Sequence, residues 1–554
     1  MDSVLAQPMQ AFAITVTLIT VTVLYRKLYH KRFRQTAHIP QLPPSLLWGH
    51  LKIFYDFTMR GKPDRHPDSM MIEMHRSLGE PPLMLIENWP IVPPMVVIPS
   101  HHVAEQITKP SSTFPYSAPK AYSVKHLRPL MGYKSIFIYQ NEEWKAIRKR
   151  FNPGFAPQHL MSLLPVIVEK MTPYLGNIDA YVRNGDVFSL DKITTNLTFD
   201  IIGVVSINED MHAQESDSQG ELVRLFKQLI KTFADDKLLL PWWLAPVPHL
   251  RRRRLGERIS QRLRAIVRRD FAEMQARGRT SKGPDALRTA VALGLQNVEA
   301  LTPDVLEETC DQLKTFFFAG HDSTSAVLTW AMYELSRTPH ALQCVREELD
   351  GLFGKDGARE PAVVRAKLLG PGGNELIHRM RYISAVLKEA MRLHPPAGSM
   401  RYAPPGSGFV VSTPDGGAYN LDGCWMYLNH NLIQRDRAVF GDSADDFVPE
   451  RWLSPTADGF PTGAWRPFER GPRNCIGQEL ANIELRVLVA MLAQRYDFTK
   501  VGVGELDLDQ HDLPSLDAKG QFKVKSELYN TFKITGKPVD GMMMKVKLAS
   551  SMAE

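Results

Sequence analysis

The sequence predicts a mainly α-helical fold with minor β structure, formed by one large domain that follows a single N-terminal membrane helix. Three observations lead to this prediction. Residues 3–25 carry no charge, and helical patterns dominate residues 141–392. Short apolar runs interrupted by glycine and proline lie before residue 98 and again between residues 398 and 427. Runs of this kind are typical of small sheets.

The uncharged N-terminal stretch is long enough to cross a membrane, which takes about 20 residues. Basic residues follow it at once, namely Arg26, Lys27, Lys31, Arg32 and Arg34. Because positive charge favours the cytosolic side of a membrane, the rest of the chain is predicted to face the cytosol. A cleaved signal peptide would carry its positive charge before the apolar run. We therefore assign residues 1–25 to an anchor, residues 26–50 to a basic stop-transfer segment and proline-rich hinge, and residues 51–554 to the large domain.

The cysteine content and the charge of the chain exclude several classes of protein. The 554 residues carry a net charge of +7 and four cysteines, Cys310, Cys344, Cys424 and Cys475. Their wide spacing gives no zinc-binding CxxC pair, no disulfide framework and no CxxCH motif. A reducing, cytosol-facing compartment fits this usage. No nucleic-acid-binding motif accompanies the basic charge, so anionic lipid and an acidic protein partner are its favoured ligands.

The segment Phe468–Ala481, FERGPRNCIGQELA, carries the strongest functional signal. Cys475 lies four residues after Gly471 and two residues before Gly477. Gly471 allows a sharp turn, and Gly477 allows the start of a helix to lie against a flat ligand. Backbone N–H groups and the helix dipole then favour a sulfur anion. A cysteine in this setting is suited to binding a metal rather than to filling a core.

This segment resembles the haem-ligand signature of the cytochrome P450 family and matches every fixed position of that signature. The resemblance implies that the Cys475 thiolate binds the haem iron and that Phe468 shields the sulfur from water. It also implies that Gly477 lets the haem approach and that Arg473 pairs with a haem propionate. The implied cytochrome P450 fold covers about residues 40–545, as one large helical domain with small sheets.

Two further stretches resemble parts of the family that contact the haem propionates. Trp144 and Arg148 lie four residues apart and share a helical face, as in the WxxxR helix of the family. The alternative interpretation of this short motif is a packed edge with a cation–π contact. Arg401, which follows HPPAGSM, is a third candidate propionate partner.

A long helix is predicted from Thr302, a good N-cap followed by Pro303, to Ser336. Its centre, FFFAGHDSTS, resembles the oxygen-activation motif of the family, A-G-x-D/E-T-T. The resemblance makes Asp322 and Ser323 the residues that deliver protons through water. Ser323 stands at the usual threonine position. Serine keeps the hydroxyl donor but lacks the methyl group that restricts the rotamer, so the sequence leaves open how efficiently oxygen use is coupled to product formation.

Neighbouring residues of the same helix receive further assignments. Thr324 is a third candidate catalytic residue, although it lies about 100° further round the helix than Ser323 and cannot simply replace it. Phe318 and Ala319 are predicted to line an apolar substrate pocket. Gly320 is interpreted as making room for a ligand, with a packing glycine as the alternative. His321 is expected to lie on an ordinary helix surface or groove.

A second set of charged residues is assigned to a structural network. Glu389 and Arg392 share a helical face, and the later segment FVPERWL supplies Arg451. An exposed pair of this kind stabilises a protein by only about 0.3–0.5 kcal/mol. In the family, however, three residues in this order are coupled behind the haem. His394, two residues after Arg392, is interpreted as structural rather than as an iron ligand.

The resemblance implies a haem-thiolate monooxygenase that holds haem b and inserts one oxygen atom from O2 into a lipophilic small molecule. Electrons would come from a membrane-bound NADPH–cytochrome P450 reductase, with cytochrome b5 as a further donor, at the endoplasmic reticulum. The segment FNPGFAPQHL resembles fungal members of secondary metabolism and predicts a secondary-metabolite intermediate as substrate. Two other classes remain open: an oxygen-independent haem-thiolate isomerase or dehydratase, and a non-catalytic membrane protein that binds haem.

One apolar stretch keeps two interpretations. Residues 237–250, KLLLPWWLAPVPHL, run directly into four arginines at 251–254. The stretch is either part of the core or a second membrane contact, in which Trp242 and Trp243 would lie at the lipid–water interface.

Overall fold

The computed structural model describes residues 2–89, 92–215, 218–235, 245–276, 289–355, 357–454, 459–531 and 533–549, with side chains from residue 11 onward. The two adjacent tryptophans at 242 and 243 lie outside these residues, so both interpretations of their stretch stay predictions. The chain divides into two compact units. Unit 1 comprises residues 1–63, 67–121 and 399–433, and unit 2 comprises residues 64–66, 122–398 and 434–554.

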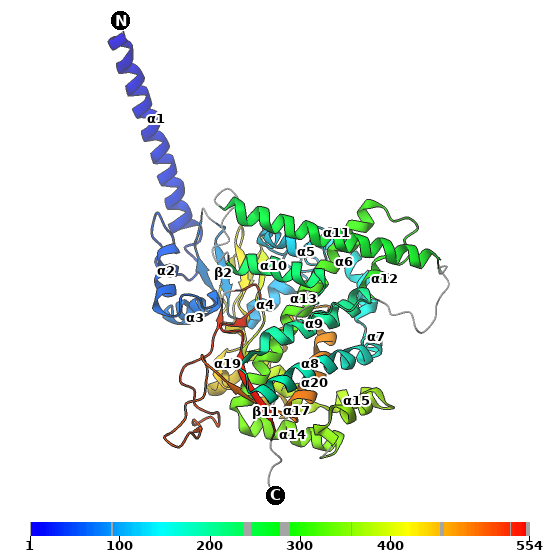
Figure 1. Cartoon of the computed structure of the whole chain (residues 1–554). Coiled ribbons are helices and arrows are strands. Elements are labelled where there is room, and N and C mark those ends of the chain that lie inside the picture. The colour runs from blue at the N-terminus through cyan, green and yellow to red at the C-terminus, as the bar shows by residue number, and fades with distance from the viewer. Residues whose placement is uncertain are drawn as a thin grey trace. The chain divides into compact units, whose positions relative to one another are not determined.

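Unit 1 begins with the long helix α1 (Asp2–His30), which a π-helical turn extends over Lys31–Gln35 (Figure 1). The helix therefore runs beyond residue 25, where the anchor was expected to end. Its segment Ala11–Gln35 is long and apolar enough to cross a membrane, with a mean hydropathy of 1.5 in its most apolar window. Side chains such as Phe12 and Leu18 are exposed along it. The prediction of one candidate membrane helix at the N-terminus is confirmed.

Arg32, one of the five basic residues after the apolar stretch, is buried in the protein instead of lying beside the membrane. Arg32 is 1% exposed and forms a buried ion pair with Glu87, with 3.0 Å between Nη1 and Oε1. A guanidinium in this position cannot contact lipid headgroups. Arg32 therefore fastens the end of the apolar helix to the strand region of unit 1.

The main sheet of unit 1 has four short strands in the order β1 (Met84–Ile86), β2 (Met95–Ile98), β7 (Trp425–Leu428) and β4 (Ser399–Tyr402). Strands β2 and β7 pair in parallel, whereas the two outer pairs are antiparallel. A separate hairpin joins β5 (Val410–Ser412) and β6 (Ala418–Asn420). The helices of this unit are α2 (Leu51–Arg60), α3 (Pro67–Ser77), α4 (His101–Thr108) and α18 (His430–Ile433). The early and late strands predicted from the sequence are thus confirmed.

Unit 2 is built mainly from helices. Its first half contains α5 (Arg128–Met131), α6 (Asn141–Phe151), α7 (Pro157–Ser162), α8 (Leu164–Asn184), α9 (Leu190–Ile207), α10 (Glu221–Asp235), α11 (Pro246–Ala276) and α12 (Ala290–Gly294). Its second half contains α13 (Pro303–Arg337), α14 (Pro339–Phe353), α15 (Pro361–Leu369), α16 (Gly373–Arg379), α17 (Arg381–Leu393), α19 (Arg437–Phe440) and α20 (Gln478–Ala493). The region from residue 141 to residue 392, where the sequence shows helical patterns, is therefore mostly helical in the structure.

Helix α13 is the central element of unit 2. Thr302 caps it, because its hydroxyl accepts a hydrogen bond from the Val305 amide at 3.4 Å. The helix packs against α9, α11, α17 and α20, and most of its side chains are buried. The long uninterrupted helix predicted from Thr302 to Ser336 is confirmed.

Unit 2 also contains two small sheets near the C-terminus. One has the order β3 (Phe188–Ser189), β11 (Met543–Leu548) and β8 (Tyr496–Lys500). The other pairs β9 (Asn530–Thr531) with β10 (Lys537–Pro538). The second pair has functional interest because it presents Lys537 to the middle of α13.

Candidate active site

The cysteine loop is a tight turn that ends at the start of α20. Gly471 adopts a left-handed conformation with φ of +76°, which a side chain would disfavour. The Asn474 amide then donates to the Gly471 carbonyl at 3.1 Å, and the Cys475 amide donates to the Phe468 carbonyl at 2.8 Å. Gly477 is the residue immediately before the helix. The loop therefore folds back on itself and holds Cys475 just ahead of a helix N-terminus.

Local groups favour a sulfur anion at Cys475, although burial opposes it. Desolvation raises the pKa of the thiol, while the backbone N–H of Gly477 and the charge of Arg148 act in the opposite direction. The side chain is nevertheless accessible. An accessible thiol just ahead of a helix N-terminus can be reached by a ligand. A cation bound there would complete the stabilisation of the thiolate.

Helix α6 braces this loop through Arg148. Its guanidinium donates to the Asn474 carbonyl oxygen at 2.8 Å and to the Asn474 side chain at 3.1 Å. A third bond, of 2.8 Å, joins its Nε to Asn152. Arg148 thus holds the residue directly before Cys475 and brings positive charge to the sulfur. Its predicted contact with a haem propionate remains a prediction.

Arg473 and Trp144 are brought together by the same loop. The Arg473 guanidinium lies 5.1 Å from the centre of the Trp144 ring and donates to Gln140 at 2.7 Å. It also donates to the carbonyl of Ile136 at 3.2 Å. The alternative interpretation of the WxxxR motif was a packed edge with a cation–π contact. Such a contact occurs at Trp144, and the cation is Arg473 of the cysteine loop. The propionate roles of Trp144 and Arg473 remain predictions.

Arg401 belongs to unit 1, where it lies on β4. Its side chain is fully buried, and Nη1 donates to the Ser117 hydroxyl and to the Ala118 carbonyl, both at 3.3 Å. These contacts orient the guanidinium within its own unit. Its role toward a haem remains a prediction.

The middle of α13 has one accessible side in an otherwise buried helix. Ala319 is exposed and Ser323 is half-buried, whereas Phe318 is only 6% exposed. The Ser323 hydroxyl donates to the Ala319 carbonyl at 2.8 Å, which orients it along this side. Accessible atoms in the middle of a core helix indicate that this side borders an internal space. Of the two predicted pocket residues, Ala319 has this exposure and Phe318 does not.

Gly320 and His321 differ from what the sequence predicted, which was room for a ligand at Gly320 and a helix surface or groove at His321. A β-carbon on Gly320 would lie 2.7 Å from the side chain of Ile202 on α9. Gly320 is therefore a packing glycine, which was the less favoured interpretation. Of the two places expected for His321, a helix surface is wrong, because the side chain is 1% exposed and stacks on Phe199 of α9 with 3.8 Å between ring centres. Burial lowers the pKa of His321 to about 4, which keeps the ring neutral.

Asp322 forms a buried ion pair that sequence reasoning did not anticipate. Its carboxylate lies 2.9 Å from Nζ of Lys537 and accepts a hydrogen bond from Thr535. Lys537 also contacts Asp191 of α9 at 2.8 Å and the hydroxyl of Ser325 at 3.2 Å. Burial alone would raise the pKa of Asp322, but Lys537 and its other partners outweigh burial and lower it. Asp322 is therefore an ionised carboxylate engaged with Lys537, and its role in proton delivery remains a prediction.

Thr324 leads to a second residue that sequence reasoning missed. It is 3% exposed and hydrogen-bonded to Glu484 of α20, which is also 3% exposed. Burial raises the pKa of Glu484 to about 8, so this carboxyl group is mostly protonated at neutral pH. The pair lies one residue further along α13 than Ser323, on a different side of the helix. No local sequence signal marks Glu484, because its acid–base character comes from packing between two helices that are distant in sequence.

The raised pKa of Glu484 predicts a pH-dependent stability difference. Between pH 4.5 and about 8 the folded protein binds one more proton at Glu484 than the unfolded chain, so its stability falls as pH rises through this range. Glu484→Gln lacks this titration. We expect the melting temperature of the wild type to fall relative to that of the variant as the pH is raised from 6 to 9. Parallel melting curves across this range would contradict the prediction. Glu479→Gln, at an exposed position of the same helix, is the matched control.

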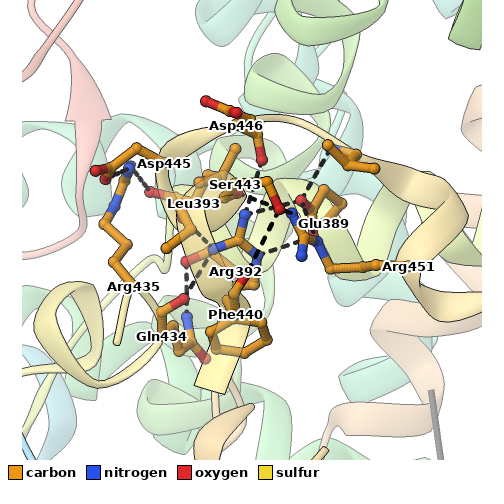
Figure 2. A network of polar contacts seen from close by, with 12 residues as sticks. Glu389, Arg392, Leu393, Gln434, Arg435, Phe440, Ser443, Asp445, Asp446 and Arg451 are labelled. Carbon is orange, nitrogen blue, oxygen red and sulfur yellow. Dashed lines mark hydrogen bonds and ion pairs between the residues drawn. The ribbon is translucent and has the colours of Figure 1, made fainter. Parts of the chain in front are cut away.

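Glu389, Arg392 and Arg451 form a buried charged network (Figure 2). Arg392 contacts both carboxylate oxygens of Glu389, at 2.8 and 2.9 Å, and Arg451 contacts one of them at 3.0 Å. The Arg392–Glu389 pair is fully buried, unlike the exposed pair considered from the sequence. The structure thus brings together the three residues that the sequence grouped.

The same network fastens loops to α17. Arg392 donates to the carbonyls of Gln434 at 2.9 Å and Asp446 at 2.8 Å, and Arg451 donates to that of Ser443 at 2.9 Å. His394, at the end of this helix, stacks on Trp330 with 3.7 Å between ring centres, and its Nε2 lies 2.8 Å from Glu334. The first arrangement holds segments that precede the cysteine loop, and the second joins the end of α17 to α13.

The accessible cysteine at a helix start and the accessible side of α13 are suited to a flat group bound through sulfur. The family model of cytochrome P450 matches residues 41–524. The chain is 30% identical to the cytochrome P450 monooxygenase acrF of Aspergillus aculeatus, covering 87% of this chain and 97% of that protein. The chain belongs to the cytochrome P450 family, and its relatives include fungal monooxygenases.

Two further comparisons bear on the fold and on electron supply. The chain is 26% identical to the bifunctional cytochrome P450/NADPH–P450 reductase ascE of Acremonium egyptiacum, over 66% of this chain and 33% of that protein. Among solved structures, that of the cytochrome P450 CYP102L1 superimposes with a TM-score of 0.67 at 18% identity, over 87% of this chain and 98% of the other. The predicted cytochrome P450 fold is thereby confirmed. The protein is a cytochrome P450 monooxygenase, and the family implies haem with a cysteine thiolate ligand.

Proposed function

We propose that this monooxygenase binds its haem through Cys475 and inserts oxygen into a lipophilic small molecule, an intermediate of secondary metabolism. The observation that carries the proposal is the cysteine loop. It holds an accessible sulfur ahead of α20, with the Gly477 amide and the Arg148 guanidinium both favouring its anion. The accessible residues Ala319 and Ser323 of α13 offer a second wall, with one apolar side chain and one hydroxyl. When bound, the haem supplies the oxygen chemistry that no amino-acid side chain can perform.

The residues of the chain have separate tasks in this proposal. Cys475 supplies the axial ligand, and Arg148 and Arg473 would hold haem propionates by charge-assisted hydrogen bonds. Ser323 presents a hydroxyl that can exchange its bond to Ala319 for one to water, and so hold a proton near the substrate. Glu484, mostly protonated at neutral pH, is a proton donor within the same core. Phe318 contributes apolar bulk behind Ala319.

The first test of this proposal is the ferrous–CO minus ferrous difference spectrum of membranes that contain the full chain. A strongly red-shifted Soret band is expected from thiolate ligation, and Cys475→Ala is expected to abolish it. Cys424→Ala, at a buried cysteine of unit 1, serves as the control and should keep the band. A thiolate spectrum retained in Cys475→Ala would refute the ligand assignment.

Electrons are proposed to come from an NADPH-dependent cytochrome P450 reductase, with cytochrome b5 as a further donor. Support comes from ascE, whose name joins a P450 and such a reductase in one protein. The test is oxygen uptake that depends on both NADPH and added reductase, with labelled O2 entering the product. Turnover without O2 would instead indicate an isomerase or dehydratase, and an absence of turnover across a panel of lipophilic substrates would favour a non-catalytic haem protein.

Helix α1 supports a proposal for the cellular location. We propose that this helix anchors the protein in the endoplasmic reticulum membrane with the catalytic part in the cytosol. The exposed apolar segment Ala11–Gln35 and the basic residues that follow residue 25 support this orientation. Protease added to sealed microsomes is expected to digest the catalytic part. Full protection of that part would reverse the orientation.

A further inference from the structure

Three side chains with metal-binding chemistry meet on the surface of unit 2, on elements other than the cysteine loop. His340 and Cys344 lie four residues apart and share one face of α14. Glu450 reaches the same point from the short 3-10 helix Pro449–Trp452. Nε2 of His340 lies 3.8 Å from Sγ of Cys344 and 3.5 Å from Oε1 of Glu450. All three ligand atoms lie within 4.8 Å of one another.

These separations are close to those of a zinc coordination shell. Zinc binds nitrogen, oxygen and sulfur at roughly 2.0–2.3 Å in a tetrahedral arrangement, so its ligand atoms lie roughly 3.3–3.7 Å apart. The His340–Glu450 distance already falls in this range, and the His340–Cys344 distance exceeds it slightly. The remaining separation, between Cys344 and Glu450, is no more than 4.8 Å, so the three atoms need to approach one another only slightly.

Neighbouring contacts hold the ligand-bearing elements in position. The Tyr382 hydroxyl, at the start of α17, donates to the Glu450 carboxylate and is also hydrogen-bonded to Cys344. The Glu348 carboxylate of α14 accepts bonds from the amides of Tyr382 at 2.7 Å and Ile383 at 3.0 Å. These bonds tie α14 to α17 and aim the Glu450 side chain toward α14. Outer contacts of this kind orient metal ligands in known sites.

The donor set indicates which metal would bind. A thiolate, an imidazole and a carboxylate suit a borderline-soft divalent cation such as Zn2+, whereas Mg2+ and Ca2+ prefer oxygen ligands alone. A divalent cation at this point would attract both the sulfur as its anion and the carboxylate, and its binding would release the thiol proton.

We propose that His340, Cys344 and Glu450 form a Zn2+ site with three protein ligands and one open coordination position for water. None of these residues is among those proposed above to hold the haem or to take part in the monooxygenase reaction. Glu450 directly precedes Arg451, whose guanidinium contacts Glu389 at 3.0 Å. A bound zinc ion would therefore cross-link α14 to the loop that carries one member of the buried charged network, and would stabilise the folded protein.

The test uses the purified full chain with haem bound, in detergent, titrated with Zn2+ alone. Alkylation of each cysteine by iodoacetamide is followed by mass spectrometry of its peptide. Zinc is expected to slow alkylation of Cys344 by about tenfold or more, while buried Cys310 and Cys424 stay unreactive with and without metal. Mg2+ should give no protection. An unchanged rate at Cys344 in saturating zinc would overturn the proposal.

Variants distinguish a three-ligand zinc site from weak binding of zinc to a single surface histidine. His340→Ala and Cys344→Ser are expected to weaken zinc binding, measured against a fluorescent chelator, by more than the roughly 10- to 100-fold cost of losing an outer contact. Tyr382→Phe should weaken it by about that smaller factor. His378→Ala, at an exposed histidine of α16, should bind zinc like the wild type. Equal affinity in His340→Ala and the wild type would refute the site.

Thermal stability gives an independent readout. The melting temperature of the wild type is expected to rise with zinc concentration, because zinc binds the folded state. His340 is exposed, so His340→Ala should fold normally and show no such rise. A zinc-dependent rise that persists in this variant would place the bound metal elsewhere and exclude the proposed ligands.

Discussion

Glu389→Gln is expected to lower the free energy of unfolding by about 3–5 kcal/mol, the usual cost of removing one partner from a buried ion pair. The change leaves the guanidiniums of Arg392 and Arg451 in the core without their shared anion, at positions where they are at most 7% exposed. It also weakens the bonds that Glu389 accepts from the Val448 amide and the Trp452 indole. Chemical denaturation monitored by circular dichroism measures this loss.

The chain contains a matched control for this prediction. Glu142 and Lys145 form an ion pair with the same i, i+3 spacing, but their side chains are 77% and 60% exposed. Glu142→Gln is therefore expected to change stability by less than about 1 kcal/mol. If both variants lost the same small amount, the network would have no special structural role. The fraction of haem that stays bound to Glu389→Gln during gel filtration would show how far the cysteine loop depends on the network.

Lys537→Met is expected to have a comparable effect on the core near α13. It leaves the carboxylates of Asp191 and Asp322 buried without their shared cation, at an expected cost of about 3–5 kcal/mol. Lys537 also donates to the hydroxyls of Thr195 and Ser325, which connect α9 to α13. Because Ser323 lies two residues from Ser325, we expect more oxygen consumed per product formed, measured as peroxide release.

The pH dependence of this variant distinguishes electrostatics from lost packing. In the wild type, the lowered pKa of Asp322 means that its contribution to stability is present above pH 4 and is lost as the pH falls below it. Without Lys537, burial favours protonation of the Asp322 carboxylate in the folded state, so the deficit of the variant should be larger at pH 8 than at pH 5. Asp322→Asn combined with Lys537→Met should recover part of the loss.

An exposed lysine provides the control for Lys537. Lys525 pairs with Glu505 at 3.0 Å, but its side chain is 55% exposed. Lys525→Met is expected to cost less than about 1 kcal/mol and to show no added pH dependence. A Lys537→Met deficit that did not vary with pH would indicate that the methylenes of the lysine stabilise the core more than its charge does.

Prediction from sequence succeeded where the physical cause is local. The uncharged stretch, the Thr302 cap and the glycine-flanked cysteine each depend on neighbours in the chain, so their patterns can be recognised directly. The grouping of Glu389 with Arg451 rested on family resemblance, since their contact joins residues 62 apart. Their complete burial could not be read from the motifs.

The errors have a common cause. Gly320 and His321 are small or polar residues in a motif, and motif reasoning assigned them to a ligand groove or a surface. The structure packs Gly320 against Ile202 and stacks His321 on Phe199, because α9 lies along this part of α13. Only the position of the second helix distinguishes a packing glycine from one that admits a ligand.

The class of this protein can be predicted from sequence patterns alone: a membrane-helix candidate, a mainly helical domain and a cysteine loop with the pattern of a haem ligand. Such features follow from hydrophobicity, turn chemistry and spacing, which act over a few residues. Tertiary structure alone decided which charges are neutralised inside the core. It placed Lys537 between Asp191 and Asp322, buried Glu484 against Thr324, and brought Glu450 to the His340–Cys344 face. Charges and donors acquire these properties only from desolvation and from partners that the chain brings together over long distances in sequence.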